Sequence, residues 1–506
     1  MSPPDGAGRR DRPMRTPRLL FAALLTALAT QAAAEPARVS TKAGVLVGEQ
    51  RADGSLAFLG VPFARPPVGD LRWKPPAPLP AWSGERAALK SGSACLQTSR
   101  GWNAADAARS SEDCLYLDIR VPKHSAGAKL PVMVWVHGGA NHAGSGAGTV
   151  ESSLVDQGVI LVSVQYRLGV FGFLSHPGLT REQGGASGNY ALMDLIAALR
   201  WVHDNAAAFG GDPGNVTLFG HSAGGQDVGL VMLSPHARGL FARGILQSGP
   251  PGFGFAPRSL KQNEAIGLQL ARGVGARSLA DLRKVSGPEL LRAAEDLKAP
   301  IDDQGFIWTQ AVVDGVVLPK APEALLADPA IKPMIVGSSA REIALFGGDP
   351  ARAKAWVVET FGARAPQVLA LYGLDHDPPP AADPLRGDAV LQLAADRMFR
   401  CPAASVAALR EKTGGKVWRY ELAVPPPGQA VVGHGSELTN VFDRPAEGRP
   451  PMQAYWAVFA RTGDPNAAGL PPWPAEDGAA RRLVFAPDGP RAEQGGEPAC
   501  RFLTRP

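Results

Sequence analysis

Short apolar runs alternate with longer amphipathic segments over most of the chain. Apolar residues recur at helical spacing from Ala191 to His203, and further helical patterns fill residues 259–297. Strands that alternate with helices predict a mostly parallel β-sheet covered by helices on both faces. The runs typical of buried strands are Leu115–Val121, Pro131–Val136, Val159–Tyr166, Val216–Phe219, Gly244–Gln247, Met334–Val336 and Val417–Leu422.

The N-terminal region carries two other patterns. Residues Val39 to Ala64 alternate between apolar and polar around Asp53-Gly54, which predicts a β-hairpin. Before it, an arginine-rich segment precedes the short apolar run Leu19–Ala29 and the A-x-A sequence Ala32–Ala34, which is typical of a secretory signal peptide. We therefore expect a signal peptide at 1–34, with Met14 as an alternative start, and a single exported domain at 35–506, periplasmic or secreted.

Composition and charge narrow the choice of partners. The chain has 506 residues, 45% of them hydrophobic and 20% charged, which is ordinary for a globular protein with a large core. Residues 1–34 hold five Arg and two Asp, so their removal lowers the formal charge from +5 to +2 (47 basic minus 45 acidic residues). This balance predicts neither a nucleic-acid partner nor an anionic membrane surface, and no later run is long enough to span a membrane. The sequence does not indicate an oligomeric state.

The chain has four cysteines, and an exported protein meets an oxidising compartment. Three disulfide pairings are possible. The spacing favours a short loop between Cys95 and Cys114, which leaves Cys401 and Cys500 to hold the C-terminus. No cysteine has the spacing of a metal ligand, so no metal site is expected.

The best candidate for chemistry is the sequence Gly220-His221-Ser222-Ala223-Gly224, a G-x-S-x-G pattern directly after a predicted strand. A strand that turns sharply into a helix holds such a serine in a strained, exposed position. The N-terminal N–H groups of the following helix point at the place where negative charge develops. The pattern predicts a nucleophile elbow at Ser222.

A serine hydroxyl needs a base, and that base needs an orienting acid. In folds with this elbow the acid and then the histidine follow the serine along the chain. Of the three later histidines, His236 is too near the elbow and His376 lies in a loop best read as solvated, so His434 fits best. Glu342 follows the strand at Met334–Val336, where such folds place functional groups; by position alone a surface ion pair remains an alternative.

A glycine-rich loop upstream could bind an oxyanion. The strand Pro131–Val136 ends in His137-Gly138-Gly139-Ala140, where small residues would let backbone N–H groups approach a substrate oxygen. The N–H of Ala223 would supply a third donor. We expect His137 to order this loop without taking part in the chemistry.

Several ordered motifs together resemble the type-B carboxylesterase/lipase family, which includes the cholinesterases and many bacterial esterases. The resemblance implies an α/β-hydrolase fold, with inserted helices and loops around an active-site gorge. It implies a triad of Ser222, His434 and Glu342, oxyanion donors at Gly139, Ala140 and Ala223, a Cys95–Cys114 disulfide, and Ser248 near the histidine. The motifs are Gly60–Pro67, Ser111–Leu117, Asn205–Gly225, Gln247–Gly249, Val313–Gly315, His434–Leu438 and Arg461–Asn466.

The chain departs from this family in four places. His221 stands where a glutamate is usual, Ala140 replaces a glycine of the oxyanion loop, Asp227 a serine and Gln165 an asparagine. For His221 two roles are open: a second base near the ester, or a residue that orders the elbow. We favour the second, because adjacent side chains on a tight turn diverge. Trp102 does not match the cation-binding tryptophan of cholinesterases, and we expect it at the rim of the site.

The expected function is hydrolysis of small-molecule carboxylic esters through an acyl-enzyme, with no cofactor. One alternative keeps this mechanism but acts mainly on carbamates, amides or aromatic esters. Another is a non-catalytic binding member of the fold. Four aromatic residues could line an acyl or alcohol pocket or could equally belong to the core: Phe253, Phe255, Trp308 and Phe346.

Overall fold

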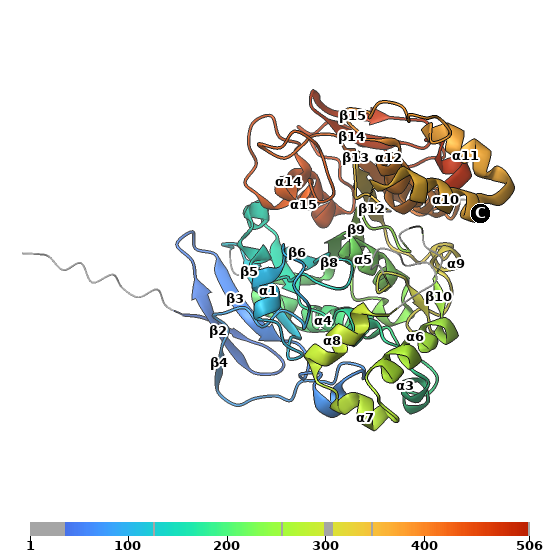
Figure 1. Ribbon diagram of the computed structural model, residues 1–506. Helices are drawn as coiled ribbons and strands as arrows, with labels where there is room; N and C mark the ends of the chain where they lie inside the picture. Colours follow the sequence, from blue (N-terminus) through green and yellow to red (C-terminus); the bar gives the residue numbers. More distant parts are fainter. Residues whose placement is uncertain are drawn as a thin grey trace, which may run out of the picture. The chain divides into compact units, whose positions relative to one another are not determined.

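A 13-stranded β-sheet organises the protein (Figure 1). The structure is a computed structural model that describes residues 36–124, 127–252, 254, 257–297, 307–345 and 348–503. Within these residues the strands follow the order β1-β2-β3-β5-β7-β6-β8-β9-β12-β13-β14-β15, and β4 pairs with β2. Their bounds are β1 Ala37–Ser40, β2 Val45–Gln50, β3 Leu56–Pro62, β4 Glu85–Ala87, β5 Tyr116–Val121, β6 Leu130–Val136, β7 Ile160–Val164, β8 Gly211–His221, β9 Arg243–Gln247, β12 Met334–Ser339, β13 Val417–Leu422, β14 Arg482–Ala486 and β15 Gly489–Glu493.

The centre of the sheet, from β7 to β14, is parallel throughout. Every residue of β7, β12 and β13 is buried, as expected for parallel strands that are covered on both faces. All seven strands predicted from apolar runs are present at the expected positions. The predicted N-terminal hairpin is present as β2 and β3, which pair antiparallel.

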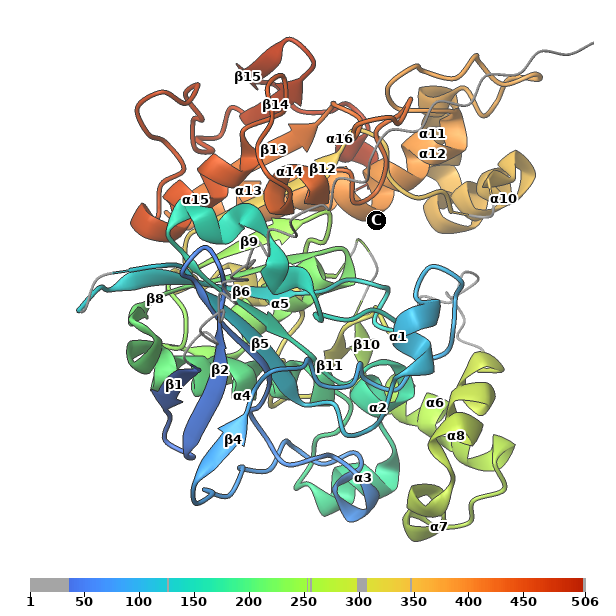
Figure 2. The ribbon, with the colours of Figure 1, turned by 90° about the vertical axis from the view of Figure 1, so that its left-hand side faces the viewer.

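Helices pack against both faces of the sheet (Figure 2). The predicted helix at 191–203 is α4, Tyr190–Asn205, and the segment 259–297 forms α6 Leu260–Gly273, α7 Leu279–Lys284 and α8 Gly287–Glu295. Helix α5, Ala223–Leu233, is buried on every side. Its glycines permit this: a Cβ at Gly225 would lie 2.9 Å from the carbonyl oxygen of Gln247 on β9, so a larger residue would push the helix off the sheet.

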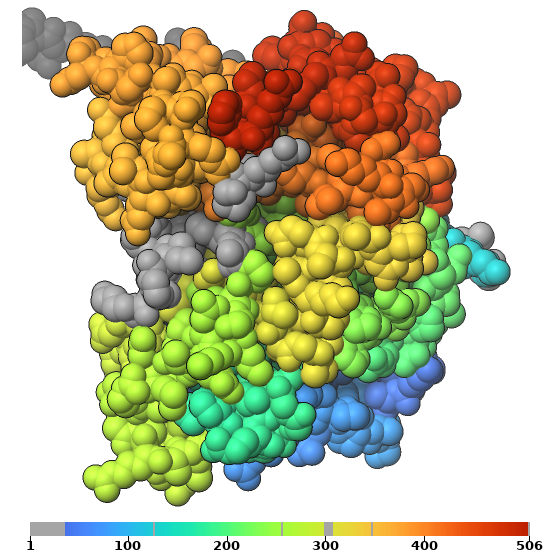
Figure 3. Space-filling view, turned by 90° about the vertical axis from the view of Figure 1, so that its right-hand side faces the viewer, coloured from blue at the N-terminus to red at the C-terminus, as the bar shows by residue number. Residues whose placement is uncertain are grey.

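The C-terminal part of the chain holds elements that the apolar runs did not predict. Strands β14 and β15 extend the sheet, and helices cover it around them (Figure 1). On the face shown in Figure 3, the orange segment with α10 and α11 and the yellow-green helices α6 to α8 occupy opposite ends. These helices are α10 Pro350–Phe361, α11 Ala365–Tyr372, α12 Ala389–Ala395, α13 Cys401–Lys412, α14 Leu438–Phe442, α15 Met452–Thr462 and α16 Cys500–Leu503.

Two disulfides join distant parts of the described chain. Cys95 pairs with Cys114, and Cys401 pairs with Cys500, which is the pairing that spacing favoured. The second bond ties α16 to the start of α13 and thereby holds the C-terminal helix. Its loop spans 99 residues of sequence separation, and such long loops lose the most freedom in the unfolded state when they are closed.

The expected signal peptide at 1–34 lies outside the described residues. In the part of the chain that is described, no helix combines the length and the apolar character needed to cross a membrane.

Candidate functional site

Ser222 occupies a strained turn between β8 and α5. Its backbone has φ +58° and ψ −128°, a conformation that non-glycine residues rarely adopt. Close packing holds the turn in place: a Cβ at Gly220 would lie 2.6 Å from the carbonyl oxygen of Gly224, and one at Gly249 would collide with that of Ser222. The strand, the turn and the helix predicted from the G-x-S-x-G pattern are therefore present, and small residues surround the serine.

The glycine-rich loop after β6 lies directly against this turn. A Cβ at Gly138 would be 2.6 Å from the carbonyl oxygen of His221 and 2.9 Å from the Cβ of Ser222. Gly139 and Ala140 follow with φ values of +118° and +53°. The loop therefore passes beside the serine, where the expected oxyanion donors would have to lie, and Ala223 is the first residue of α5, directly after Ser222.

His434 and Glu342 meet although 92 positions separate them in the sequence. The Nδ1 atom of His434 lies 2.5 Å from Oε2 of Glu342, and the other oxygen of Glu342 accepts a hydrogen bond of 2.8 Å from the backbone N–H of Ser339. Glu342 is 5% exposed. It therefore binds the imidazole inside the protein, and the alternative of a surface ion pair is wrong.

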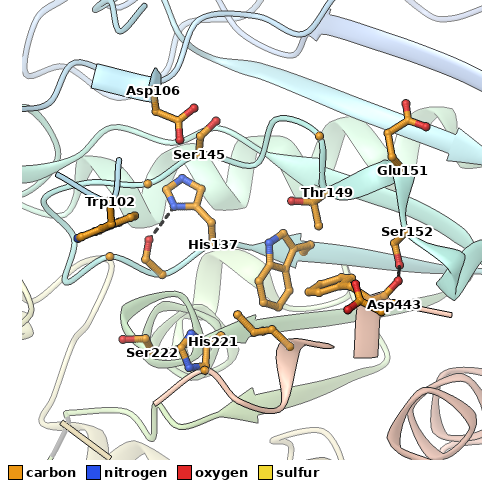
Figure 4. Close-up of a pocket in the computed structure, with 18 of the residues that line it drawn as sticks. Trp102, Asp106, His137, Ser145, Thr149, Glu151, Ser152, His221, Ser222 and Asp443 are labelled. Carbon is orange, nitrogen blue, oxygen red and sulfur yellow. Dashed lines mark hydrogen bonds between the residues drawn. The ribbon is translucent and has the colours of Figure 1, made fainter. Parts of the chain in front are cut away.

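Ser222 and His434 open into one large cavity of about 1290 Å³. Gly139 and Ala140 contribute to the same wall. In Figure 4, Ser222 and His221 lie at one side of this cavity, whereas Glu151, Ser152 and Asp443 lie at the other. The structure therefore brings together the serine, the histidine and the glycine-rich loop in a space large enough for a sizeable ligand.

The charge of Glu342 controls the electrostatics of His434. Burial by itself lowers the pKa of His434, but the charge of Glu342 and its hydrogen bond outweigh burial and raise that pKa above the ordinary histidine value. The same carboxylate fixes the imidazole ring, since the Nδ1–H donates to it. The Nε2 atom is then the one that can accept a proton.

A second buried carboxylate, Glu437, had no role assigned from the sequence. Its side chain is fully buried and accepts hydrogen bonds from Ser248 (3.1 Å), Ser339 (3.3 Å) and Tyr420 (3.5 Å). Burial, together with the charge of Glu342, raises the pKa of Glu437 to about 7. The spacing H-x-x-E in His434–Glu437 was the available signal, because a residue three positions after the histidine can pack behind it.

His221 lies in the wall of the cavity, next to His434. The two imidazole rings have centroids 4.5 Å apart, and the Nε2 of His221 is 3.7 Å from Oε1 of Glu437. Burial and the neighbouring His434 hold the pKa of His221 well below its ordinary value, so its ring is neutral at neutral pH. His221 and Ser222 both contribute to the wall of this cavity.

Other expected residues lie as follows. His137 stacks on Tyr166 at 4.6 Å, and its Nδ1 bonds the carbonyl oxygen of Gly138, so it orders the loop. Trp102 is 68% exposed and lines the cavity, which places it at the rim. Trp308 is 2% exposed and belongs to the core. Phe253, Phe255 and Phe346 lie outside the described residues.

Asp227 is a buried acid behind the glycine-rich loop. It lies on α5, and its Oδ1 accepts a hydrogen bond of 3.3 Å from Asn141, the residue that follows Ala140. Burial raises the pKa of Asp227 to about 8, although the hydrogen bond from Asn141 opposes this. The unfolded chain loses this proton near pH 4, so the folded state binds more protons between pH 4 and 8, and Asp227 lowers stability as the pH rises through that window.

We therefore expect Asp227→Asn to stabilise the protein increasingly as the pH rises from 4 to 8, by about 1–3 kcal/mol at pH 8. The amide keeps the acceptor for Asn141 but removes the cost of a buried charge. Urea unfolding of both proteins at pH 5 and pH 8 measures this difference. An equal effect at the two pH values would show that ionisation of Asp227 has no part in it.

Known proteins match this sequence over nearly its whole length. A model of the carboxylesterase family matches residues 35–361 and 367–494. A fumonisin B1 esterase from Sphingopyxis macrogoltabida is 35% identical over 450 residues, which cover 82% of this chain and 81% of that protein. The liver carboxylesterase 1 of Oryctolagus cuniculus is 34% identical over 528 residues, 91% of each chain. A solved structure of a PNB esterase superposes with a TM-score of 0.80 and 28% identity, over 93% of this chain and 99% of that one.

Proposed function

We propose that this chain, which belongs to the carboxylesterase family and is a carboxylic ester hydrolase, cleaves its substrates through an acyl-enzyme on Ser222. His434 takes the proton of the Ser222 hydroxyl as the oxygen attacks the ester carbonyl carbon. It then gives that proton to the leaving alcohol. Water activated by His434 releases the acid and restores the serine.

Glu342 and the glycine-rich loop stabilise the charges that this sequence creates. Glu342 holds the imidazole by Nδ1 and stabilises the imidazolium. The N–H groups of Gly139, Ala140 and Ala223 receive the negative oxygen of the tetrahedral intermediate. No cofactor enters these steps.

The contact between His434 and Glu342, at the wall of the cavity that holds Ser222, carries the proposal. A histidine held by a buried carboxylate beside a strained, accessible serine is the arrangement that activates a serine hydroxyl. The cavity volume of about 1290 Å³ leaves room for esters with a bulky acyl or alcohol part.

A covalent label tests the proposal. We expect a fluorophosphonate probe to modify the protein with one equivalent at Ser222, identified by peptide mass spectrometry. A protein that hydrolyses p-nitrophenyl esters yet carries the label elsewhere, or resists labelling, would contradict the assignment. p-Nitrophenyl esters of graded acyl length, alongside carbamate and anilide analogues, then define the preferred substrate class.

We also propose that residues 1–34 direct export and that residues 35–506 form one domain. The two disulfides support an oxidising destination, since such bonds persist mainly in exported proteins.

A further inference from the structure

Two imidazoles and two carboxylates lie together at the wall of the cavity that holds Ser222. His221 comes from the end of β8, Glu342 from the loop after β12, and His434 and Glu437 from the segment that leads into α14. Contacts join them in a chain: Glu342 to His434 at 2.5 Å, His434 to His221 at 4.5 Å between ring centroids, and His221 to Glu437 at 3.7 Å. We name these four residues the His/Glu quartet.

We propose that His221 is a positioning residue for His434: its ring packs against the imidazole and thereby holds His434 in contact with Glu342. This inference rests on the proposed function, because it takes His434 as the base. His221 itself does not touch the reacting atoms. It affects the reaction through the position and the pKa of His434.

Packing around His434 supports this role. Phe399 lies against the imidazole at 5.2 Å between ring centroids, and His221 packs on it at 4.5 Å. The loop that carries His434 also packs against His221, since a Cβ at Gly435 would lie 3.4 Å from Cε1 of His221. Gly435 has φ +85°, which favours glycine. Removal of the His221 ring would therefore free the imidazole of His434 to move away from Ser222.

The charges around the quartet explain why a neutral ring fits at position 221. Two carboxylates, Glu342 and Glu437, already face His434, and both raise its pKa. Tyr420, a further titratable group, donates to Glu437, and Ser248 and Ser339 are neutral donors to it. A carboxylate at 221, as the resembling family usually has, would add another acidic group beside Glu342 and Glu437. His434 would then hold its proton to higher pH and be inactive as a base over a wider range.

The first test separates packing from charge by two substitutions. We expect His221→Ala to lower kcat by roughly 10- to 100-fold with little change in KM, because a base displaced by about 1 Å transfers protons poorly. His221→Gln fills the space without charge and should recover most of that loss. Wild-type kcat in His221→Ala, or a loss confined to KM, would overturn the inference.

The second test uses the pH profile of kcat/KM between pH 5 and 9. Activity rises with pH as His434 loses its proton, and His221→Glu should move the midpoint of that rise upward by about one unit or more. His221→Gln should leave the midpoint near that of the wild type. The matched control is His376→Glu, the same change at an exposed histidine in the loop between α11 and α12, which should not move the midpoint. An unmoved midpoint in His221→Glu would overturn the inference.

Failure of this inference and failure of the proposed function give different results. Every His221 variant keeps Ser222, so a fluorophosphonate should still label each of them there, more slowly in His221→Ala. Normal kinetics in labelled variants would refute only the role of His221. Absence of label at Ser222 in the wild type would refute the proposed function. Should His221→Glu not fold, His221→Ala and His221→Gln still decide the matter.

Discussion

Replacement of Ser222 by alanine is expected to lower kcat for p-nitrophenyl ester hydrolysis by roughly 10⁵- to 10⁶-fold, by analogy with loss of the nucleophile in another serine hydrolase. This variant lacks the oxygen that the proposed acyl-enzyme requires. His434 and Glu342 then have no alcohol to activate. Residual turnover comes from binding and from the N–H groups of the glycine-rich loop alone.

KM or substrate binding should change far less than kcat, because the cavity stays intact. The matched control is Ser153→Ala, a serine that lines the same cavity at a distance from the turn and bonds the carbonyl oxygen of Phe442. This control should hydrolyse esters close to the wild-type rate. Turnover by Ser222→Ala within about tenfold of the wild type would rule out Ser222 as the nucleophile.

Glu342→Gln should have the second-largest effect, a fall in kcat of roughly 10⁴-fold, as for removal of the orienting carboxylate in another serine hydrolase. The glutamine oxygen can still accept the hydrogen bond from the N–H of Ser339. Its amide group then faces Nδ1 of His434 and requires an acceptor there. That favours the imidazole tautomer whose Nε2 carries the proton, which cannot take a proton from Ser222.

Steady-state kinetics over a range of pH measure this loss, and thermal unfolding checks that the fold persists. Glu359→Gln on the exposed face of α10 makes the same chemical change outside the site and should leave kcat as it is. A loss below about tenfold in Glu342→Gln would mean that Glu342 neither orients His434 nor stabilises its charge.

Predictions from the sequence succeeded where local pattern and chemistry coincide. The strand before Ser222, the turn and helix α5 follow from apolar residues next to G-x-S-x-G, and each is present. The α/β-hydrolase fold and membership of the carboxylesterase family are confirmed by the similar proteins and structures. The choice of His434 required only chain order and the exclusion of two other histidines, and its contact with Glu342 agrees with that choice.

The apolar runs did not predict β14 and β15. β14 does carry a short buried apolar run, Leu483–Ala486, which is not among the predicted strands. β15 has only partly buried and exposed residues, so its sequence lacks the pattern of a core strand. It exists because β14 offers it a pairing edge. An aromatic residue such as Trp308 can line a pocket or fill the core, and only the packing in the folded protein showed that Trp308 belongs to the core.

The sequence by itself determined the reaction class, because short local motifs carry it. These are the G-x-S-x-G pattern at Ser222, the acid and histidine that follow it along the chain, and the glycine-rich loop. Only the tertiary structure decided what surrounds His434. Positions 221, 342 and 437 lie far apart along the chain, and it is the parallel sheet that brings the ends of β8 and β12 to the same edge as the loop before α14. Electrostatic energies depend on distance and burial, which no local pattern encodes. For that reason the sequence did not reveal that His221 packs against His434, or that Glu437 lies close to both histidines.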